Sequence, residues 1–377
     1  MTLSDICELI VDCPHSTAKD EGEGYPLIRT PNIGKGRLIL NGVHRVSKEV
    51  YDKRNARAVP QDDDLILARE APAGNVAIVK NGEKVCLGQR TVLIRPDRNK
   101  VYPDFLAYYI LAPEQQYELL GTANGATVAH VNIPVIRSLP ITLPDMDVQK
   151  MAANILKAYD DLIENNQKQI KLLEEAAQRL YKEWFVDLHF LGYEDVQIID
   201  GVPEGWHLGS LLEVAEFKRG KTITKAQVEE GTIPVVAGGL EPAYYHNVAN
   251  TKAPVITVSG SGANAGFSRM YHEDVFASDC SYADIQATKS VSFVYCFLKA
   301  NKFQLDALQK GSAQPHVYAK DINAMELMIP TAEIIKEFCN KTDPLFNSIG
   351  VLQKQNTYAA EARDRLLPKL MSGEIEL

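Results

Sequence analysis

The sequence lacks the features of several common protein classes. No apolar run approaches the roughly 18–20 residues that a membrane-spanning helix needs. The first residues, MTLSDICELIVDC, contain no basic segment ahead of an apolar one, so we expect no secretory signal and a cytoplasmic protein. The six cysteines lie far apart without a C-x-x-C pair, and no H-E-x-x-H occurs. This spacing argues against a metal site and favours reduced, mostly buried thiols.

Motifs for nucleotide binding and catalysis are missing as well. The phosphate-loop pattern G-x-x-x-x-G-K-[ST] does not occur. Residues 260–266 read GSGANAG, but their spacing differs from a dinucleotide-binding loop and no helix pattern follows, so we interpret them as a turn between strands. The acidic-Pro-Pro-aromatic tetrapeptide typical of amino-methyltransferases is absent, and no Ser/His/Asp or Cys/His arrangement stands out. We therefore expect a non-catalytic chain.

The charge of the chain is unevenly distributed. The formal net charge is −9, which argues against a simple nucleic-acid coat. Residues 29–57 nevertheless hold eight lysines and arginines against only Glu49 and Asp52. Such a local excess can bind phosphates on an acidic chain, because screening makes the nearest charges matter most. A solvated basic face that binds nothing explains the pattern equally well.

The second half of the chain repeats the first. Leu143-Pro144 and Ile329-Pro330 lie 186 residues apart, and the same offset joins QKQ at 167–169 to QKQ at 353–355 and EAAQRL at 175–180 to EARDRL at 361–366. Two similar loops, GTANGATVAHVNI at 121–133 and GSAQPHVYAKDI at 311–322, precede the prolines. The period is far longer than that of a solenoid repeat, so we predict an internal duplication.

Each half divides into a globular part and a long helix. β-Branched runs flank Gly/Ala/Asn turns in DDLILAREAPAGNVAIV and APVITVSGSGANAGFSR, which predicts strand–turn–strand units. Short helices are predicted in residues 102–120 and 290–309. The fold class expected is α+β, with two globular domains joined by two long helices. The predicted boundaries are 1–146 and 191–330 for the domains, and 147–190 and 331–377 for the helical regions.

The first long helix is predicted from residue 147 to 186, where neither proline nor glycine occurs. Apolar residues recur every three or four positions, and Asn166 falls on the same seam, where a polar residue fixes register at some cost in stability. The predicted seam contains Val148, Ala152, Ile155, Tyr159, Leu162, Leu173, Leu180 and Trp184.

The second long helix is predicted to begin near Thr331, to be kinked or interrupted at Pro344 and Gly350, and to stop at Gly373. A helix with a narrow apolar stripe must bury it. Connectivity then favours an antiparallel coiled coil of the two helices.

The sequence resembles the specificity (S) subunit of type I restriction–modification enzymes over essentially its whole length. The opening ICELIVDCPHSTAKDEGEGYPLIRTPNIGKGRL is similar to the start of a target-recognition domain of that family. AREAPAGNVAIV, LGQRTVLIRP, LYKEWFVDLHF, VPEGWHLGSL and RLLPKLMSGEIEL resemble its recurring segments, in the order the family has them. One departure is Val148-Gln149, where the family usually has Glu-Gln.

The resemblance implies two target-recognition domains that each read half of a split, asymmetric DNA target. It also implies that the helical regions space these domains and bind two methyltransferase subunits, which hold S-adenosylmethionine and methylate adenine, and that restriction/translocase subunits join the complex. No cofactor is expected in this chain, and no membrane partner.

The residues expected to contact bases or phosphates combine positive charge with side chains that reach base edges. In the first domain they are Arg29, Asn32, Lys35 and Arg37, and in the second Lys218, Arg219, Lys221, Gln314, His316 and Lys320. Solvated surface side chains remain the alternative interpretation for each.

Two other functions stay open. A free-standing nuclease or methyltransferase would be active alone with metal or S-adenosylmethionine, although the necessary motifs are missing. A coiled-coil adaptor whose recognition domains no longer read DNA would assemble with a methyltransferase without directing sequence-specific methylation.

Overall fold

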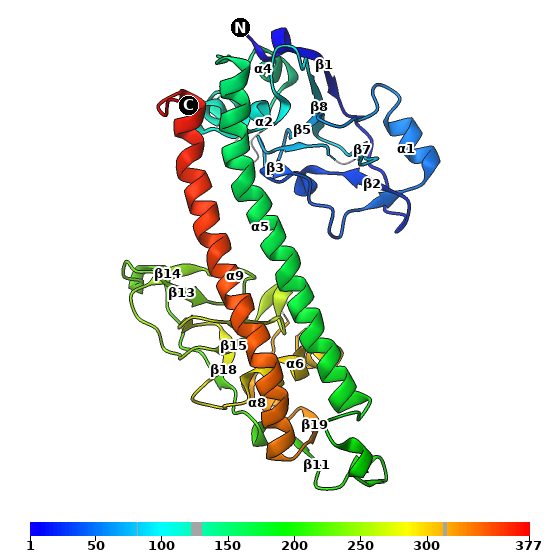
Figure 1. The fold of residues 1–377 in the computed structure, drawn as a ribbon, viewed down its shortest axis with the longest axis vertical. Helices are drawn as coiled ribbons and strands as arrows, with labels where there is room; N and C mark the ends of the chain where they lie inside the picture. The colour runs from blue at the N-terminus through cyan, green and yellow to red at the C-terminus, as the bar shows by residue number, and fades with distance from the viewer. Residues whose placement is uncertain (81, 122–129, 312–314) are drawn as a thin grey trace. The chain divides into compact units, whose positions relative to one another are not determined.

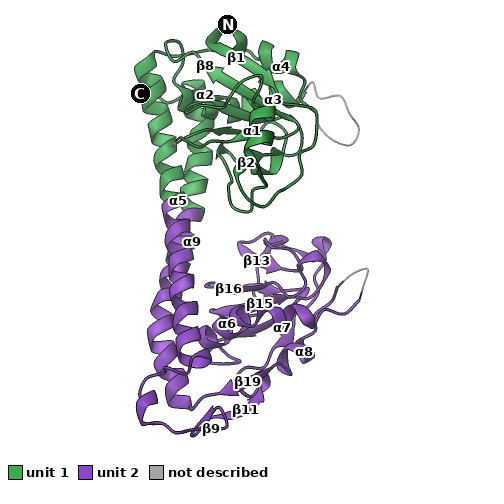
Figure 2. Ribbon diagram, turned by 90° about the vertical axis from the view of Figure 1, so that its right-hand side faces the viewer, with its two compact units in different colours: residues 1–164, 357–377 green, residues 165–356 purple. Residues whose placement is uncertain are grey.

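The computed structural model describes residues 1–80, 82–121, 130–311 and 315–377. It forms two compact units (Figures 1 and 2): residues 1–164 with 357–377, and residues 165–356. Each unit contains one globular part and one stretch of each long helix. Because the units divide the helices between them, the predicted limits of the globular domains stay a prediction.

The first unit is built on a five-stranded sheet in the order β1-β8-β5-β6-β3. These strands are β1 (Cys7–Asp12), β8 (Thr91–Pro96), β5 (Leu65–Ala68), β6 (Val76–Ile78) and β3 (Gly36–Arg37). A three-stranded sheet adds β4 (Arg45–Val46), β2 (Tyr25–Ile28) and β7 (Cys86–Leu87), and the helices are α1 (Lys48–Arg54), α2 (Pro103–Leu111), α3 (Pro113–Gly121) and α4 (Ile133–Ser138). The central strand β5 and its neighbour β6 are buried throughout, which explains their continuous apolar sequence.

The second unit contains a four-stranded sheet in the order β12-β18-β15-β16. These strands are β12 (Lys218–Arg219), β18 (Cys280–Asp284), β15 (Val255–Ser259) and β16 (Ser268–Tyr271). A three-stranded sheet contains β14 (Tyr244–His246), β13 (Ile233–Val236) and β17 (Phe276–Ala277), and the helices are α6 (Val291–Ala300), α7 (Lys302–Ala307) and α8 (Ala319–Asn323). Two small ribbons pair β9 (Ile198–Ile199) with β10 (Val202–Pro203) and β11 (His207–Ser210) with β19 (Glu326–Ile329).

The strand pairings of the two units correspond and confirm the predicted duplication. The order β1-β8-β5-β6 of the first unit returns as β12-β18-β15-β16 in the second. In the smaller sheets, β2 pairs antiparallel with β4 and parallel with β7, and β13 pairs in the same two ways with β14 and β17. Helices α2 and α3 lie in the first predicted helical stretch, and α6 and α7 in the second.

The two long helices pack against each other within each unit. Helix α5 (Met146–Tyr181) continues through a π-helical turn to Val186, and α9 runs from Ala332 to Ser372. In the first unit Ala152 and Leu156 near the start of α5 share a core with Leu370 near the end of α9. In the second unit Trp184 and Tyr181, from the other end of α5, pack on Phe338 near the start of α9, with ring centroids 5.9 and 6.0 Å apart. Both pairings are antiparallel, as predicted.

Helix α5 carries polar residues on the seam that faces α9. The sequence pattern identified only some of them. Asn166 is buried, and its side-chain amide lies 3.4 Å from Gln355 Oε1 on α9, as expected for a seam residue. The assignment of Leu162 to the seam is wrong, because this side chain is exposed. Asp160 is buried instead and accepts hydrogen bonds of 2.6 Å from the Tyr108 hydroxyl and the Arg363 guanidinium.

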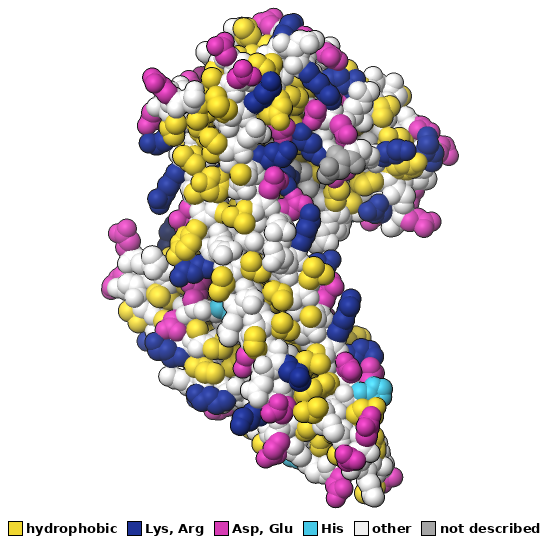
Figure 3. Space-filling view, in the orientation of Figure 1, with side chains coloured by type: hydrophobic (Ala, Val, Ile, Leu, Met, Phe, Trp, Pro, Cys, Tyr) yellow, Lys and Arg dark blue, Asp and Glu magenta, His cyan; other side chains and the backbone are white. Residues whose placement is uncertain are grey.

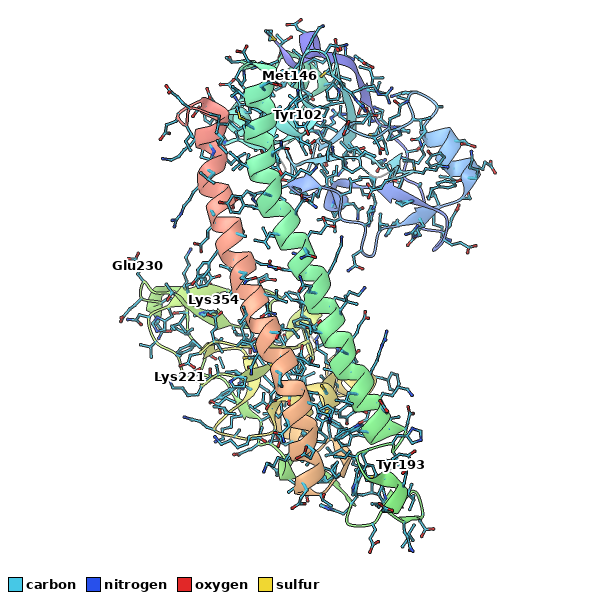
Figure 4. The ribbon with its side chains drawn as sticks, viewed as in Figure 1. Tyr102, Met146, Tyr193, Lys221, Glu230 and Lys354 are labelled. Carbon is cyan, nitrogen blue, oxygen red and sulfur yellow. The ribbon has the colours of Figure 1, made fainter. Side chains whose placement is uncertain are left out.

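Helix α5 is also fixed at its first turn to the globular part of its unit. Tyr102, which precedes α2, lies beside this turn (Figure 4), and its backbone N–H donates to Gln149 Oε1 at 2.9 Å. The Gln149 amide nitrogen donates to the carbonyl of Pro144. Gln149, the glutamine of the Val148-Gln149 pair, therefore joins helix and domain.

The predicted interruption of the second helix does not occur, because α9 is continuous through Pro344 and Gly350. Pro344 removes one helical hydrogen bond, but Phe346 and Ile349 on the following turns are buried in the core and hold the helix there. A side chain at position 350 would place its Cβ 2.6 Å from Cβ and Cγ of His272, so glycine permits this close approach. Thr331 caps the helix start and Gly373, with φ of 74°, follows its end, as predicted.

Each of the six cysteines is a free thiol in this structure, and five are buried, which agrees with the prediction that the thiols are mostly buried. Among the helices of the described residues, none combines the length and apolarity required to cross a membrane.

We predict that Gly350→Ala destabilises the protein. Alanine is favoured over glycine in a helix by about 1 kcal/mol, but the added methyl would overlap the His272 side chain. The melting temperature should fall, as measured by thermal denaturation. Gly121→Ala in α3 is the control, because among the described residues its Cβ would meet only the Tyr117 ring, at 3.9–4.0 Å. An equal or higher melting temperature for Gly350→Ala would contradict this packing.

We also predict a contribution of His272 to pH-dependent stability. Burial lowers the pKa of His272 to about 4, so the unfolded chain binds its proton more tightly than the folded chain between about pH 6.5 and pH 4. The stabilisation from neutral His272 is therefore complete above pH 6.5 and is lost as the pH falls, by about 1.4 kcal/mol per pH unit. Chemical denaturation at pH 7 and 5.5 should show a smaller loss for His272→Gln than for the natural chain; equal losses would contradict the assignment.

Candidate nucleic-acid interface

The hydrogen-bond register identifies corresponding residues at one edge of the main sheet in each unit. The last paired residues are Ala68 and Thr91 in the first unit, and Ser259 and Cys280 in the second. One residue further on, Arg69 N–H donates to the Arg90 carbonyl, and Gly260 N–H donates to the Asp279 carbonyl. We call these two places the loop edges; they comprise the residues that follow β5 and precede β8, and those that follow β15 and precede β18.

Each repeated loop returns to the loop edge of its own unit. Within the first loop sequence, Val131 N–H donates to the carbonyl of Arg69 at 2.9 Å. Within the second, Val317 N–H donates to the carbonyl of Gly260 at 3.1 Å. The offset between the two valines is the 186 residues of the duplication. The similar loop sequences therefore serve the same attachment in both units, and place His130 and His316 at corresponding positions.

A network of charges fills the loop edge of the first unit. Arg69 is buried and binds both carboxylate oxygens of Asp12 at 2.9 and 3.0 Å, and its Nε donates to the Val131 carbonyl. Its terminal nitrogen lies 2.8 Å from His130 Nε2. Because a guanidinium only donates, His130 Nε2 accepts, and its Nδ1–H donates to Glu70. Arg69 thus holds the loop in place, while Glu70 also forms an ion pair with the exposed Arg90.

The loop edge of the second unit is composed differently. The Ser261 hydroxyl hydrogen-bonds to the Asp279 carboxylate, and the Ser261 backbone forms a bridge to His316. Lys221 is exposed and its backbone N–H donates to the Ala277 carbonyl, beside the strand turn. Burial raises the pKa of Cys280 to about 12, so this neighbouring thiol is neutral. The ionic character of the edge therefore comes from its carboxylate and basic side chains.

The four residues predicted to contact DNA in the first domain have different surroundings in the structure. Arg29 follows β2 next to Gly88, and its buried Nε has no hydrogen-bond partner among the described residues. Arg29 therefore stays a candidate. Lys35 lines a cavity of about 190 Å³ together with Tyr108, Asp160 and Arg363, and no residue of the loop edge is among the residues that line it.

Two of the predicted contacts in the first domain require correction. Asn32 is buried, its amide oxygen accepts from Arg29 N–H and its amide nitrogen donates to the Ile39 carbonyl, so it stabilises a turn rather than facing a ligand. Arg37 forms ion pairs with Asp161 and Glu164 of α5. It therefore fixes β3 to the long helix.

The basic stretch at residues 29–57 is mostly used in folding, so its interpretation as a phosphate-binding patch is not supported. Arg54 is buried and donates to the carbonyls of Leu87, Ser16 and Pro14. Arg45 and Arg57 donate to other backbone carbonyls, and Lys48 pairs with Asp52. On the face of the molecule shown in Figure 3, lysine and arginine side chains are interspersed with aspartate and glutamate.

The candidates of the second domain are more accessible. Lys218, Arg219, Lys221 and Lys320 are exposed, although Lys218 Nζ lies 3.4 Å from the Glu216 carboxylate. The ring of His316 stacks on that of Tyr318, with centroids 6.0 Å apart, and Lys320 Nζ is 6.0 Å from the same tyrosine ring. Gln314 lies outside the described residues.

Sequence reasoning missed Arg69, Glu70, Arg90, Ser261 and Asp279. The available signal was the end of the continuous apolar run in β5 and in β15, but only the strand register shows which residues of the next turn face them. Within the described ranges, no cluster of histidine, cysteine and acidic side chains is arranged to hold a metal ion.

Comparisons with known proteins identify relatives over the whole chain. The curated relatives include the type I restriction enzyme MjaIX specificity subunit of Methanocaldococcus jannaschii, 25% identical and aligned over 100% of this chain and 93% of the relative. The HindI specificity subunit of Haemophilus influenzae is 22% identical over 93% and 95% of the two chains. A type I restriction–modification S subunit from M. genitalium has a similar fold, with a TM-score of 0.62 at 18% identity over 98% of this chain and 95% of that one.

A family model described as the type I restriction modification DNA specificity domain matches twice, at residues 1–175 and 203–357. The two matches fall on the two halves that the strand pairings show to be duplicated. The chain therefore belongs to the family of type I restriction–modification DNA specificity proteins.

Proposed function

We propose that this chain is the DNA specificity subunit of a type I restriction–modification complex and that it reads a split, asymmetric target. The observation that carries the proposal is the pair of loop edges. One backbone arrangement occurs in both units, but it presents Glu70 and Arg90 in one and Ser261 and Asp279 in the other. Different side chains on one scaffold suit the recognition of two different half-sites, because base edges are distinguished by their donors and acceptors.

The proposed partners follow from the family. Methyltransferase subunits would bind along the helical regions, hold S-adenosylmethionine and methylate adenine, and restriction/translocase subunits would join them in the cytoplasm. The chain itself contributes specificity and not catalysis. Relatives carry the name specificity subunit, which supports this division of labour.

The decisive experiment is co-expression of the chain with a methyltransferase subunit of the same restriction–modification system, followed by single-molecule sequencing of the host DNA. We expect methylated adenines within a two-part motif whose halves differ, and no such motif without this chain. A complex that assembles without a motif would instead support the coiled-coil adaptor. Methylation or cleavage by the purified chain alone would contradict its non-catalytic role.

A second prediction separates DNA contacts from structural arginines. Each phosphate contact changes the slope of log affinity against log salt by about 0.9. Lys221→Ala in the methyltransferase complex should reduce the magnitude of this slope by about 0.9, because Lys221 is exposed and its backbone is bound to Ala277, beside the loop edge.

Arg37→Ala is the matched control. It should leave the slope unchanged and lower the melting temperature, because Arg37 is paired with two carboxylates of α5. Fluorescence anisotropy on a duplex that carries the motif, at four salt concentrations, measures both slopes. If the natural chain, Lys221→Ala and Arg37→Ala had equal slopes, Lys221 would not contact a phosphate.

A further inference from the structure

The two loop edges carry side-chain pairs of opposite character at one structural position. Arg69 and Gly260 correspond, because each donates its N–H to the carbonyl of the residue that precedes the neighbouring strand. The residues that follow are Glu70 and Ser261, and their partners are Arg90 and Asp279. The pair in the first unit therefore presents a guanidinium, whereas the pair in the second presents a carboxylate.

We infer that Arg90 and Asp279 are specificity-determining residues, each of which contacts a base edge in one half of the DNA target. The inference rests on the proposed function and extends it to named side chains. A guanidinium suits the two acceptors of a guanine edge in the major groove, and a carboxylate suits the exocyclic amine of cytosine. One scaffold position would thus select different bases in the two half-sites.

The backbone at Arg90 supports a role beyond fold stability. Arg90 has φ of 63°, a left-handed conformation that glycine or asparagine adopts at lower cost. Its side chain is nevertheless 61% exposed, so its ion pair with Glu70 contributes little to stability. Binding of a ligand by the exposed guanidinium accounts for an arginine at a turn position where the backbone is strained.

The surroundings of each pair fit base contact. In the first unit, Glu70 is held by His130 at 3.0 Å, and His130 by the buried Arg69, so the partner of Arg90 is positioned through a chain of hydrogen bonds. In the second unit, exposed Arg219 and Lys221 flank the turn and can hold phosphates while Asp279 faces a base. Phosphate contacts position a protein on DNA, and a neighbouring base contact then specifies the sequence.

The matched controls come from the opposite end of the same sheets. Arg98 has the same 61% side-chain exposure as Arg90 and pairs with Asp63 at 3.2 Å, but it follows the other end of β8. Asp274 pairs with Lys252 beyond the opposite end of β15. Arg98→Gln and Asp274→Asn therefore remove similar charges away from the loop edges.

The test uses the full chain co-expressed with its methyltransferase subunit, with the methylated motif determined by sequencing. Arg90→Gln should reduce methylation roughly 5- to 150-fold at targets with the original base at one position of one half-site, and Asp279→Asn should do so in the other half. Arg90→Lys keeps the charge but loses the two-pronged donor, so it should relax the same position. Both controls should leave the motif unchanged.

Three results would overturn the inference. The first is that the complexes with Arg90→Gln and with Asp279→Asn both methylate the same motif as the complex with the natural chain. The second is an equal loss at both halves together with loss of the assembled complex on size exclusion, which would assign the residues to folding. The third is the absence of any motif with the natural chain, in which case the proposed function itself fails; the first two outcomes leave the proposed function standing.

Discussion

The structure depends on one constraint: α5 and α9 each carry an apolar stripe that has to be buried, and in each unit the other helix covers it. Ala152 and Leu156 share a core with Leu370 in the first unit, and Trp184 packs on Phe338 in the second. The globular parts complete these cores through α2 and α6, whose residues are almost all buried. Helix pairing and domain folding are therefore parts of the same core in each unit, and Gly350 shows how closely helix and domain approach.

The duplication preserved the backbone while side chains diverged in both core and surface. Asp160 on α5 and Phe346 on α9 lie at the repeat offset and are both buried, but one binds Arg363 and the other packs on the Tyr295 ring at 5.6 Å. The loop edges diverged in the same manner, from Glu70–Arg90 to Ser261–Asp279. Inside the core, such changes must leave every buried polar group with a hydrogen-bond partner. At an exposed edge this constraint is absent, so the side chains can differ according to the ligand that they bind.

Much of the fold could be predicted from the sequence, because the repeat offset of 186 residues and the 3–4 spacing of apolar residues are both visible in the sequence itself. The long helices, their antiparallel pairing and the paired short helices are confirmed. Asp160 could not be predicted, since a seam carboxylate resembles a surface residue until Tyr108 and Arg363 are placed beside it. The site was harder still: the basic run at 29–57 indicated phosphate binding, but Arg54 and Arg37 serve contacts between segments distant in the chain. Only strand register brings Arg90 beside Glu70.

The central claim is that each unit reads its own half-site on a common scaffold. The most direct test is a chimaeric chain in which residues 191–330 are replaced by a second copy of residues 1–146, co-expressed with the methyltransferase subunit and analysed by sequencing of methylated DNA. We predict a two-part motif in which both halves contain the same bases as one half of the natural target. An assembled, active complex that still methylates the natural asymmetric motif would contradict it.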